Sequence, residues 1–517
     1  MSATTIVLLL LSTILAIIRV FVQGLGHSFT GNQKPSATHS KRMPGPMPWP
    51  LIGDLPRLGA TASPFQAFSQ MSRVYGEIYK LRLGSADCVV VSSFRLIKEV
   101  LIAKGAHFGG RPDLLRFHAL FGGDRNNSLA LCDWSSLQKT RRGIARTYCS
   151  PRFASSNYDQ LDRVAGQEAD CLLQHVDLHI RTTDSATVHI KPLLLAACAN
   201  MFSSYMCSVR FKYEDTGFRD MVRRFDGIFW EINQGYAVDF LPWLQPFYSK
   251  HLAKLAGWTR DIRRFVHERV VEDRLQKSAA KEGGEPTSNE GAPKDFTDAL
   301  LAHLRDDPSL TWHHILYELE DFLGGHSAVG NLAMLVLTAI VRHPQVGKKI
   351  QEEVDSITKG TRSINLFDKA EMPYTEATIL ETLRTTSSPI VPHVATQHTT
   401  IADYTVQKGT IVFLNNYELN TAAEYWEEPE QFRPERFISN GQIKKPEYFI
   451  PFSTGKRTCI GQKLVNGFCF ILITRLLQHY DISAVDLEQI DTRPACVALP
   501  PDSFPLKITH RKCSILT

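Results

Sequence analysis

The chain has 517 residues, of which 43% are apolar and 21% are charged, so it has ample material for a folded core and is not a disordered chain. Its net charge of +5 is too small for this length to indicate nucleic-acid binding, although a local basic surface could dock an acidic protein. Ten cysteines are scattered without a C-x-x-C pair, which argues against a zinc site and a disulfide scaffold. We therefore expect reduced thiols in a protein that faces the cytosol.

An apolar run at residues 6–22, IVLLLLSTILAIIRVFV, is just long enough to span a bilayer. A cleaved signal peptide is the alternative, but no basic residue precedes the run and no A-x-A cleavage pattern follows it. Lys34, Lys41 and Arg42 come after the run, which places the rest of the chain on the cytoplasmic side. We predict an N-terminal membrane anchor, a basic and proline-rich linker and one large folded domain, at residues 1–24, 25–50 and 51–517.

The folded domain is predicted to be mainly α-helical with a minor β part. Short β-rich runs flank a turn-like SAD, and apolar residues recur at three-to-four spacing through most of the first two thirds of the chain. In chain order we expect two strands at residues 77–84 and 88–93, followed by three amphipathic helices at 161–176, 218–232 and 252–274. A low-complexity surface loop is expected at 277–294, a long helix that ends before a proline at 316–344, and a mixed strand-and-turn region at 389–415.

One cysteine, Cys459, lies between Gly455 and Gly461 in the stretch PFSTGKRTCIG. A strongly helical segment follows, so the backbone N–H groups at its start can stabilise a thiolate. The two glycines allow a flat ligand to approach the backbone, and Arg457 offers a forked donor for a carboxylate such as a haem propionate. A single thiolate is a known proximal ligand of haem iron. The alternative is a buried structural cysteine.

The stretch FSTGKRTCIG resembles the F-x-x-G-x-R-x-C-x-G signature of the cytochrome P450 monooxygenases, with every fixed position matched. Two further stretches precede it in the family's order. ETLR, with Glu381 and Arg384, resembles the E-x-x-R helix motif, and FRPERF supplies Arg436 as the third member of that network. The resemblance covers about residues 44–510.

The resemblance implies a cytochrome P450 fold, mainly α with a minor β part, behind a single N-terminal membrane anchor. It implies haem b as the cofactor and makes residues 51–517 the haem-thiolate monooxygenase domain. Cys459 would bind the iron. The residues around it that would contact the haem are Phe452, Gly455, Arg457 and Gly461.

Further haem contacts are expected at the propionates, which need positive or donor groups. Trp134 and Arg141, seven residues apart, would share one face of a helix. The family commonly has a basic residue four positions after this tryptophan, where this chain has Gln138, so Arg141 is the expected propionate ligand and Arg142 the fallback. His393, in PIVPHV, matches a family position that reaches a propionate; a loop histidine without a ligand is the alternative.

The helix expected to cross the distal face of the haem lacks two familiar groups. The family pattern is A/G-G-x-D/E-T, whose acid and alcohol relay protons, and the matching run is Gly324, Gly325, His326, Ser327 and Ala328. The glycines preserve a groove for dioxygen and allow a local kink in the helix, with Gly325 at the haem. Ser327 is then the candidate catalytic residue, with water or a substrate hydroxyl as alternatives. His326 is expected to point elsewhere, because adjacent helical residues diverge by about 100°.

Several longer stretches, including EDFLGGHSAVGNL, FWEINQG and SSPIVPHVAT, resemble the Spook-type cytochromes P450 of arthropods, which belong to ecdysteroid synthesis. The resemblance implies an early oxidation of a sterol, 7-dehydrocholesterol or a close derivative. It also implies the endoplasmic reticulum membrane as location, with the catalytic body in the cytosol and no nucleic-acid partner. No G-x-G-x-x-G fingerprint in a βαβ context occurs, so electrons would come from NADPH through a separate cytochrome P450 reductase.

Apolar stretches offer wall material for a large apolar ligand, although ordinary core packing explains them equally well. They lie at residues 117–123, 229–244, 390–391 and 498–504. Two rival functions remain open: a haem-thiolate isomerase or dehydratase that needs no dioxygen, and a haem-based sterol sensor or carrier.

Overall fold

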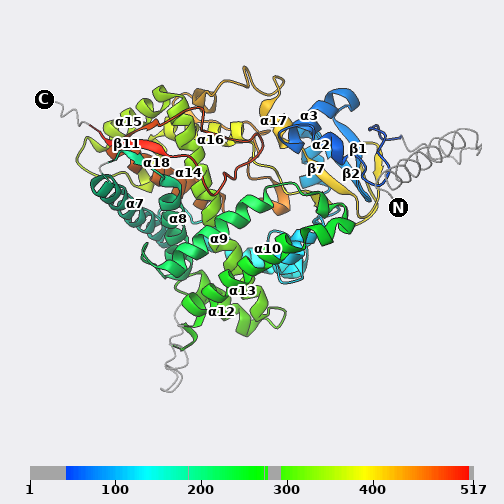
Figure 1. Ribbon diagram of the computed structural model, residues 1–517, viewed down its shortest axis with the longest axis horizontal. Helices are drawn as coiled ribbons and strands as arrows, with labels where there is room; N and C mark the ends of the chain where they lie inside the picture. Colours follow the sequence, from blue (N-terminus) through cyan, green and yellow to red (C-terminus); the bar gives the residue numbers. More distant parts are fainter. Residues whose placement is uncertain (1–41, 184, 273, 277–292, 512–517) are drawn as a thin grey trace, which may run out of the picture. The chain divides into compact units, whose positions relative to one another are not determined.

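Helices make up most of the protein (Figure 1). The computed structural model describes residues 42–183, 185–272, 274–276 and 293–511. The predicted membrane anchor and most of the predicted surface loop at 277–294 lie outside these residues. The α-helices are α2 (Leu55–Leu58), α3 (Pro64–Tyr75), α4 (Phe94–Lys98), α5 (Leu115–Leu120), α6 (Ser136–Cys149), α7 (Ser156–Thr183), α8 (Ile190–Cys207), α9 (Thr216–Ile232), α10 (Gln245–Val266), α12 (Phe296–Asp306), α13 (Trp312–Leu323), α14 (Gly325–Arg342), α15 (Pro344–Thr358), α16 (Pro373–Thr386), α17 (Asn416–Thr421) and α18 (Gln462–His479).

Short helical turns connect several of these helices. Two are π-helical, η1 (Glu99–Ala103) and η5 (His267–Val271), and the 3-10 turns are η2 (Arg125–Asn127), η3 (Ala237–Asp239), η4 (Pro242–Leu244), η6 (Leu366–Glu371), η7 (Pro434–Phe437) and η8 (Gly455–Arg457).

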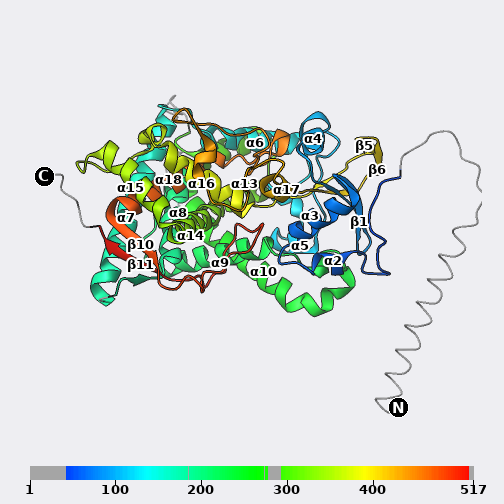
Figure 2. The same cartoon turned by 90° about the horizontal axis from the view of Figure 1, so that it is seen from above.

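Three helices, α8, α14 and α18, are buried on almost all sides. Such helices are apolar around their whole circumference and therefore occupy the centre of a helical protein. Helix α14 packs against α8, α16 and α18, and the longer amphipathic α7 covers α8 and α18 from outside (Figures 1 and 2). One continuous apolar core runs through this bundle.

The predicted long helix is interrupted once. Helix α13 ends at Leu323 and α14 begins at Gly325, with Gly324 between them. Within the described part of the chain, this pair, Trp312–Arg342, is the one stretch long and apolar enough to cross a membrane, and 83% of its most apolar window is buried in protein. It is therefore a core element.

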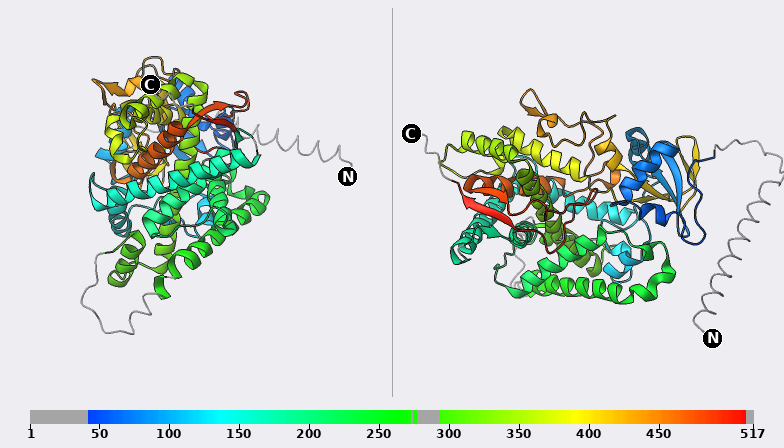
Figure 3. Two further views of the ribbon diagram at one scale, coloured as in Figure 1. Left: turned by 90° about the vertical axis from the view of Figure 1, so that its left-hand side faces the viewer. Right: turned by 45° about the horizontal axis from the view of Figure 1, so that its top comes forward.

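The β part begins with the predicted hairpin, β1 (Ile78–Leu83) and β2 (Ala86–Val91). Strand β2 pairs in parallel with β7 (Ile411–Leu414), which pairs on its other edge with β4 (His393–Val394). Figure 3 shows these blue and yellow strands together beside the helices. The smaller sheets are β10–β11–β3, β5–β6 and β8–β9, made by Tyr480–Ala484, Leu506–His510, Thr187–Val188, Thr399–Ile401, Tyr404–Val406, Ile438–Ser439 and Gln442–Ile443.

Candidate functional site

Cys459 lies in the short loop between η8 and α18, as the sequence predicted. Its backbone N–H bonds the Phe452 carbonyl at 2.9 Å, which closes the loop. Cys459 is accessible to solvent although protein surrounds it. Burial raises the pKa of the thiol, whereas the N–H groups of Gly461 and Gln462 and the charge of Arg142 lower it. These groups favour the thiolate that an iron ligand needs.

Of the two flanking glycines, Gly455 is required by the geometry. It has φ +74°, and a Cβ there would lie 2.3 Å from the Leu101 carbonyl oxygen. A Cβ on Gly461 would lie 3.9 Å from the Cys459 sulfur, which is an ordinary contact distance. Phe452, on the other side of the loop, is partly buried against the main core.

Arg457 is buried, and its oxygen acceptors are neutral. Nη1 donates to Oε1 of Gln138 at 2.6 Å and Nη2 to the Ala130 carbonyl at 2.9 Å. Burial is the main cause that lowers the pKa of Arg457 to about 10. A buried guanidinium whose only oxygen partners are neutral is stabilised by an anionic ligand.

A second buried arginine, Arg111, was missed by the sequence analysis. Its Nε donates to the same Ala130 carbonyl at 3.3 Å, and Nη1 donates to the carbonyls of Val391 and Pro392 at 2.9 and 3.1 Å. Burial, followed by the charge of Arg457, lowers its pKa well below the usual range. The stretch FGGRPD, in which two glycines precede Arg111 and a proline follows it, was the available signal.

His393 completes this group. Its Nδ1 donates to the Phe108 carbonyl at 2.7 Å, whereas its Nε2 is buried without a hydrogen-bond partner. Burial, then Arg111 and Arg457, lower the pKa of the imidazole well below its ordinary value. We call Arg111, His393 and Arg457 the basic cluster. The two buried cations fit the carboxylates of a haem, and the unpaired Nε2 of His393 could join them as a donor because an adjacent carboxylate favours protonation of the ring.

The contacts of Arg141 argue against its predicted role as a propionate ligand. Its guanidinium is buried and already held, with Nε 2.9 Å from Glu318 of α13 and Nη2 2.9 Å from the Asn127 carbonyl. The prediction of a shared helix face was wrong, because Ser135 caps α6 and Trp134 therefore precedes the helix. Trp134 lies instead against Gly109, to whose carbonyl the backbone N–H of Trp134 donates at 3.0 Å. The fallback, Arg142, donates to the Thr458 carbonyl at 2.5 Å and supports the cysteine loop.

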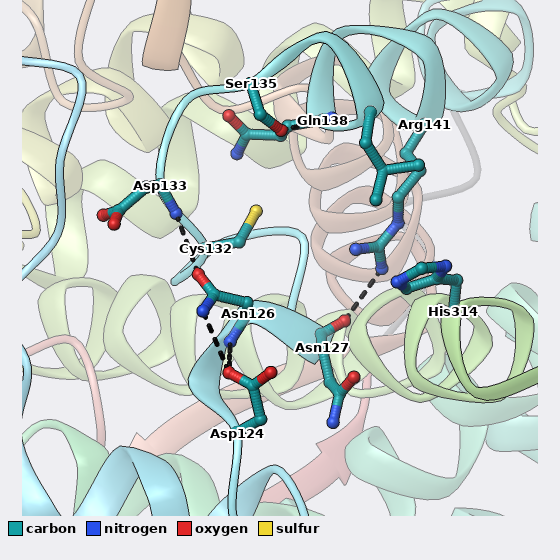
Figure 4. A pocket seen from close by; sticks show the side chains of 10 residues that line it. Asp124, Asn126, Asn127, Cys132, Asp133, Ser135, Gln138, Arg141 and His314 are labelled. Atoms are coloured by element: carbon teal, nitrogen blue, oxygen red, sulfur yellow. Dashed lines mark hydrogen bonds between the residues drawn. The ribbon is translucent and has the colours of Figure 1, made fainter. Parts of the chain in front are cut away.

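A polar cavity of about 260 Å³ borders this region (Figure 4). Gln138, which accepts from Arg457, lines it together with Cys132, Arg141 and His314. A cavity of this size has room for several water molecules beside the basic cluster, on the side of α6.

On the distal helix, Gly324, Gly325 and Ala328 are partly open, whereas His326 and Ser327 are buried. The Ser327 hydroxyl lies 3.4 Å from Nε2 of His326, so Ser327 is not on the open face where the prediction put a catalytic group. A Cβ on Gly325 would lie 3.0 Å from the ring of Phe202, so this glycine also lets α14 approach α8.

Behind that helix lies a buried network that the sequence did not reveal. The Lys191 ammonium is 2.8 Å from Asp226 and donates to the carbonyls of Leu499 and Pro500 at 3.0 and 2.9 Å. The Asn331 amide donates to Asp226 at 2.9 Å and accepts from the Leu499 N–H at 2.8 Å. The network ties α8, α9 and α14 to the loop at 498–504, one of the predicted walls.

The predicted E-x-x-R network is confirmed. Glu381 and Arg384 of α16 are both fully buried and pair at 2.8 Å, and Arg436 Nε lies 3.1 Å from Glu381. Arg384 also donates to the Asn420 carbonyl at 2.6 Å. These contacts hold the segment before the cysteine loop to α16, which is a structural role.

Comparison with known proteins gives consistent matches. A family profile described as Cytochrome P450 matches residues 43–508. Cytochrome P450 307a1 of Drosophila melanogaster is 47% identical over 496 residues, which cover 91% of this chain and 89% of the relative. Farnesoate epoxidase of Bombyx mori is 31% identical, covering 85% and 87% of the two chains. Steroid 17-alpha-hydroxylase/17,20 lyase of Ictalurus punctatus is 30% identical, covering 84% of each.

Proposed function

The chain belongs to the cytochrome P450 family, and we propose that it oxidises a sterol precursor in an early step of ecdysteroid hormone synthesis. Members of this family are oxidoreductases that use thiolate-ligated haem b and receive electrons from NADPH through a reductase. The predicted resemblance to the family and to its Spook-type group is confirmed. The single observation that carries the proposal is the 47% identity to Cytochrome P450 307a1 along nearly the whole chain.

The residues present fit a haem. Cys459 would bind the iron through its sulfur, which the N–H groups of Gly461 and Gln462 stabilise as a thiolate. When bound, the haem supplies the chemistry of dioxygen activation, which a thiolate ligand favours. Arg457, Arg111 and the free Nε2 of His393 would hold its propionates.

The roles of the remaining residues follow from their places. Gly455 and Gly461 would keep the backbone close to the ring, Phe452 would pack beside it, and Trp134 would lie at its edge near Lys456, whose ammonium is 5.8 Å from the indole centre. Gly325 would leave room on the distal face. Because Ser327 is buried beside His326, we now favour water or the substrate hydroxyl as the proton relay.

A membrane location in the endoplasmic reticulum, with the body in the cytosol, is supported by apolar side chains at the surface. Gly53 pairs with Leu83, and Gly84 abuts the Phe240 carbonyl, so the segment after the predicted anchor lies near the start of α10. The exposed apolar residues of these two segments are Met47, Trp49, Leu51, Trp243 and Phe247. Aromatic and apolar side chains of this kind insert at a lipid interface.

The substrate class is proposed from the relatives together with the site. One relative is named as a steroid hydroxylase and another as a farnesoate epoxidase. The partly open face at Gly324, Gly325 and Ala328 carries no polar side chain, which suits an apolar substrate. We therefore propose a sterol as the substrate, with a terpenoid acid as the second candidate.

The test is incubation of the full-length protein in membranes with cytochrome P450 reductase, NADPH and labelled dioxygen. The substrates are 7-dehydrocholesterol, related sterols and farnesoate, and the products are read by mass spectrometry. Label in a sterol product that requires NADPH supports the proposal. Sterol conversion without NADPH or dioxygen would identify an isomerase or dehydratase, binding without conversion would identify a sensor or carrier, and oxidation of farnesoate alone would move the enzyme to terpenoid chemistry.

A further inference from the structure

The break between α13 and α14 leaves a backbone carbonyl in need of a donor. In a continuous helix the N–H of Ser327 bonds the carbonyl of Leu323, four residues back. Here that N–H bonds the Gly324 carbonyl, three residues back, at 3.1 Å. The Leu323 carbonyl is therefore separated from its regular partner inside a buried part of the fold, where an unsatisfied acceptor is costly.

The side chain of His326 reaches this carbonyl. Its Nδ1 lies 2.5 Å from the Leu323 oxygen, and because a carbonyl only accepts, Nδ1 carries the proton. The ring is buried and stands edge-on to Phe225 of α9, with centroids 5.3 Å apart. Burial lowers the pKa of His326 to about 4, so the ring is neutral near pH 7 and its Nε2 accepts from the Ser327 hydroxyl at 3.4 Å.

We propose that His326 is a positioning residue that holds the break in the distal helix, with its Nδ1–H replacing the backbone donor that the Leu323 carbonyl has lost. Position 328, where the family pattern has an alcohol that can distort the helix, is Ala328 and has no donor. The neighbouring imidazole supplies one from inside the protein. The partly open face at Gly324 and Gly325 is thereby kept in place without a hydroxyl.

The functional side of this inference rests on the proposed function, because it assumes that this face lies over a haem. The structural side does not, because it concerns a hydrogen bond within the helix. A proton-donating role of His326 is a different idea, and it is disfavoured because the ring is neutral and Phe225 covers its edge.

A matched pair of variants isolates the bond. In His326→Asn the side-chain amide N–H can stand where Nδ1 stood, whereas in His326→Gln it stands near the place of Nε2 and loses reach to Leu323. Both are made in the full-length holoprotein. Hydrogen exchange is followed in peptides covering 320–332, with the α16 peptide at 373–386 as an internal control. The carbon monoxide stretching frequency of the ferrous protein and the peroxide released per NADPH report on the distal face.

We expect His326→Asn to behave like the wild type. In His326→Gln, amides of 320–332 should exchange roughly tenfold or more faster, as expected for loss of one buried hydrogen bond. Its carbon monoxide band should shift and its peroxide fraction should rise. If His326→Gln fails to retain haem while His326→Asn retains it, that result also supports the proposal. The proposal is overturned if the two variants behave alike, whether both are intact or both impaired, or if His326→Asn is the worse.

A rescue experiment asks whether the alcohol and the imidazole are interchangeable. Ala328→Thr should improve the exchange protection and haem content of His326→Gln and leave the wild type unimproved; no improvement in the double variant counts against the proposal. The proposed function can fail separately. If the wild type oxidises no sterol, the exchange comparison still decides the role of His326.

Discussion

The buried Lys191 network allows a quantitative prediction. Lys191→Met removes the cation from Asp226, which is buried and otherwise bonded only through Asn331 in the contacts described above, and it removes the donor from the carbonyls of Leu499 and Pro500. Loss of one member of a buried ion pair costs about 3–5 kcal/mol, because the remaining charge is uncompensated. We expect the midpoint of thermal inactivation to fall by roughly 3–5 °C, because the unfolding entropy of a chain of this size is about 1 kcal/mol/K.

The companion variant separates charge from packing. Lys191→Met/Asp226→Leu removes both charges, and a buried pair replaced by apolar residues is often neutral. We expect it to recover at least half of the loss, with the remainder due to the two carbonyls that still lack a donor. Lys348→Met, at an exposed site on α15, is the control and should change the midpoint by less than about 1 °C.

The assay is the haem-thiolate carbonyl absorbance that remains after heating for a fixed time, because unfolding of a protein with a tight cofactor is not two-state. A double variant as unstable as Lys191→Met would refute the reasoning, since the cost could not then come from an unpaired aspartate. A stable Lys191→Met would mean that water or a shifted proton compensates Asp226.

Six other variants test the site. Cys459→Ala should abolish the haem-thiolate carbonyl spectrum while the purified chain remains folded by circular dichroism; a retained spectrum would point to another ligand. Arg111→Gln and His393→Leu should each speed haem transfer to apomyoglobin by roughly tenfold, since a charge-assisted hydrogen bond is worth about 1.5–3 kcal/mol, whereas Arg141→Gln should lower expression through the loss of Glu318 pairing. Ser327→Ala should change the ratio of product to NADPH by less than about twofold, and a fall approaching the 10²–10⁴-fold typical of a proton-transfer group would return Ser327 to the mechanism. Glu381→Ala should yield little holoprotein, because two arginines lose their shared carboxylate; a haem-loaded but inactive variant would indicate a catalytic role instead.

Patterns in the sequence predicted those features of the structure that depend on residues close together along the chain. Cys459 and its glycines, the Glu381–Arg384 pair and the β1–β2 hairpin were all predicted, because each is defined by spacing within a few residues. The motifs around Cys459 and Glu381 also indicated the cytochrome P450 family.

The failures share a different cause. Arg111 and Arg457 meet on the Ala130 carbonyl, a convergence of segments more than 300 residues apart that no spacing encodes. Arg141 was assigned to a propionate from its spacing to Trp134, and its partner Glu318 lies 177 residues away in the sequence, where no local spacing points to it. A local kink at the glycines was expected from the sequence, but only the hydrogen bonds of His326 and Ser327 show how the helix is interrupted.

The parallel pairing of β2 with β7 has a consequence for biosynthesis. Val91 pairs with Leu414, so a ribosome that has just released β2 must add more than 300 residues before its neighbour exists. At about 5–20 residues per second this takes roughly 15–65 seconds. During that interval the edge of β2, with Val89, Val90 and Cys88 otherwise buried, has unpaired backbone groups that invite chaperones or aggregation. A nascent chain in this state would depend on cellular folding factors until its last quarter emerges.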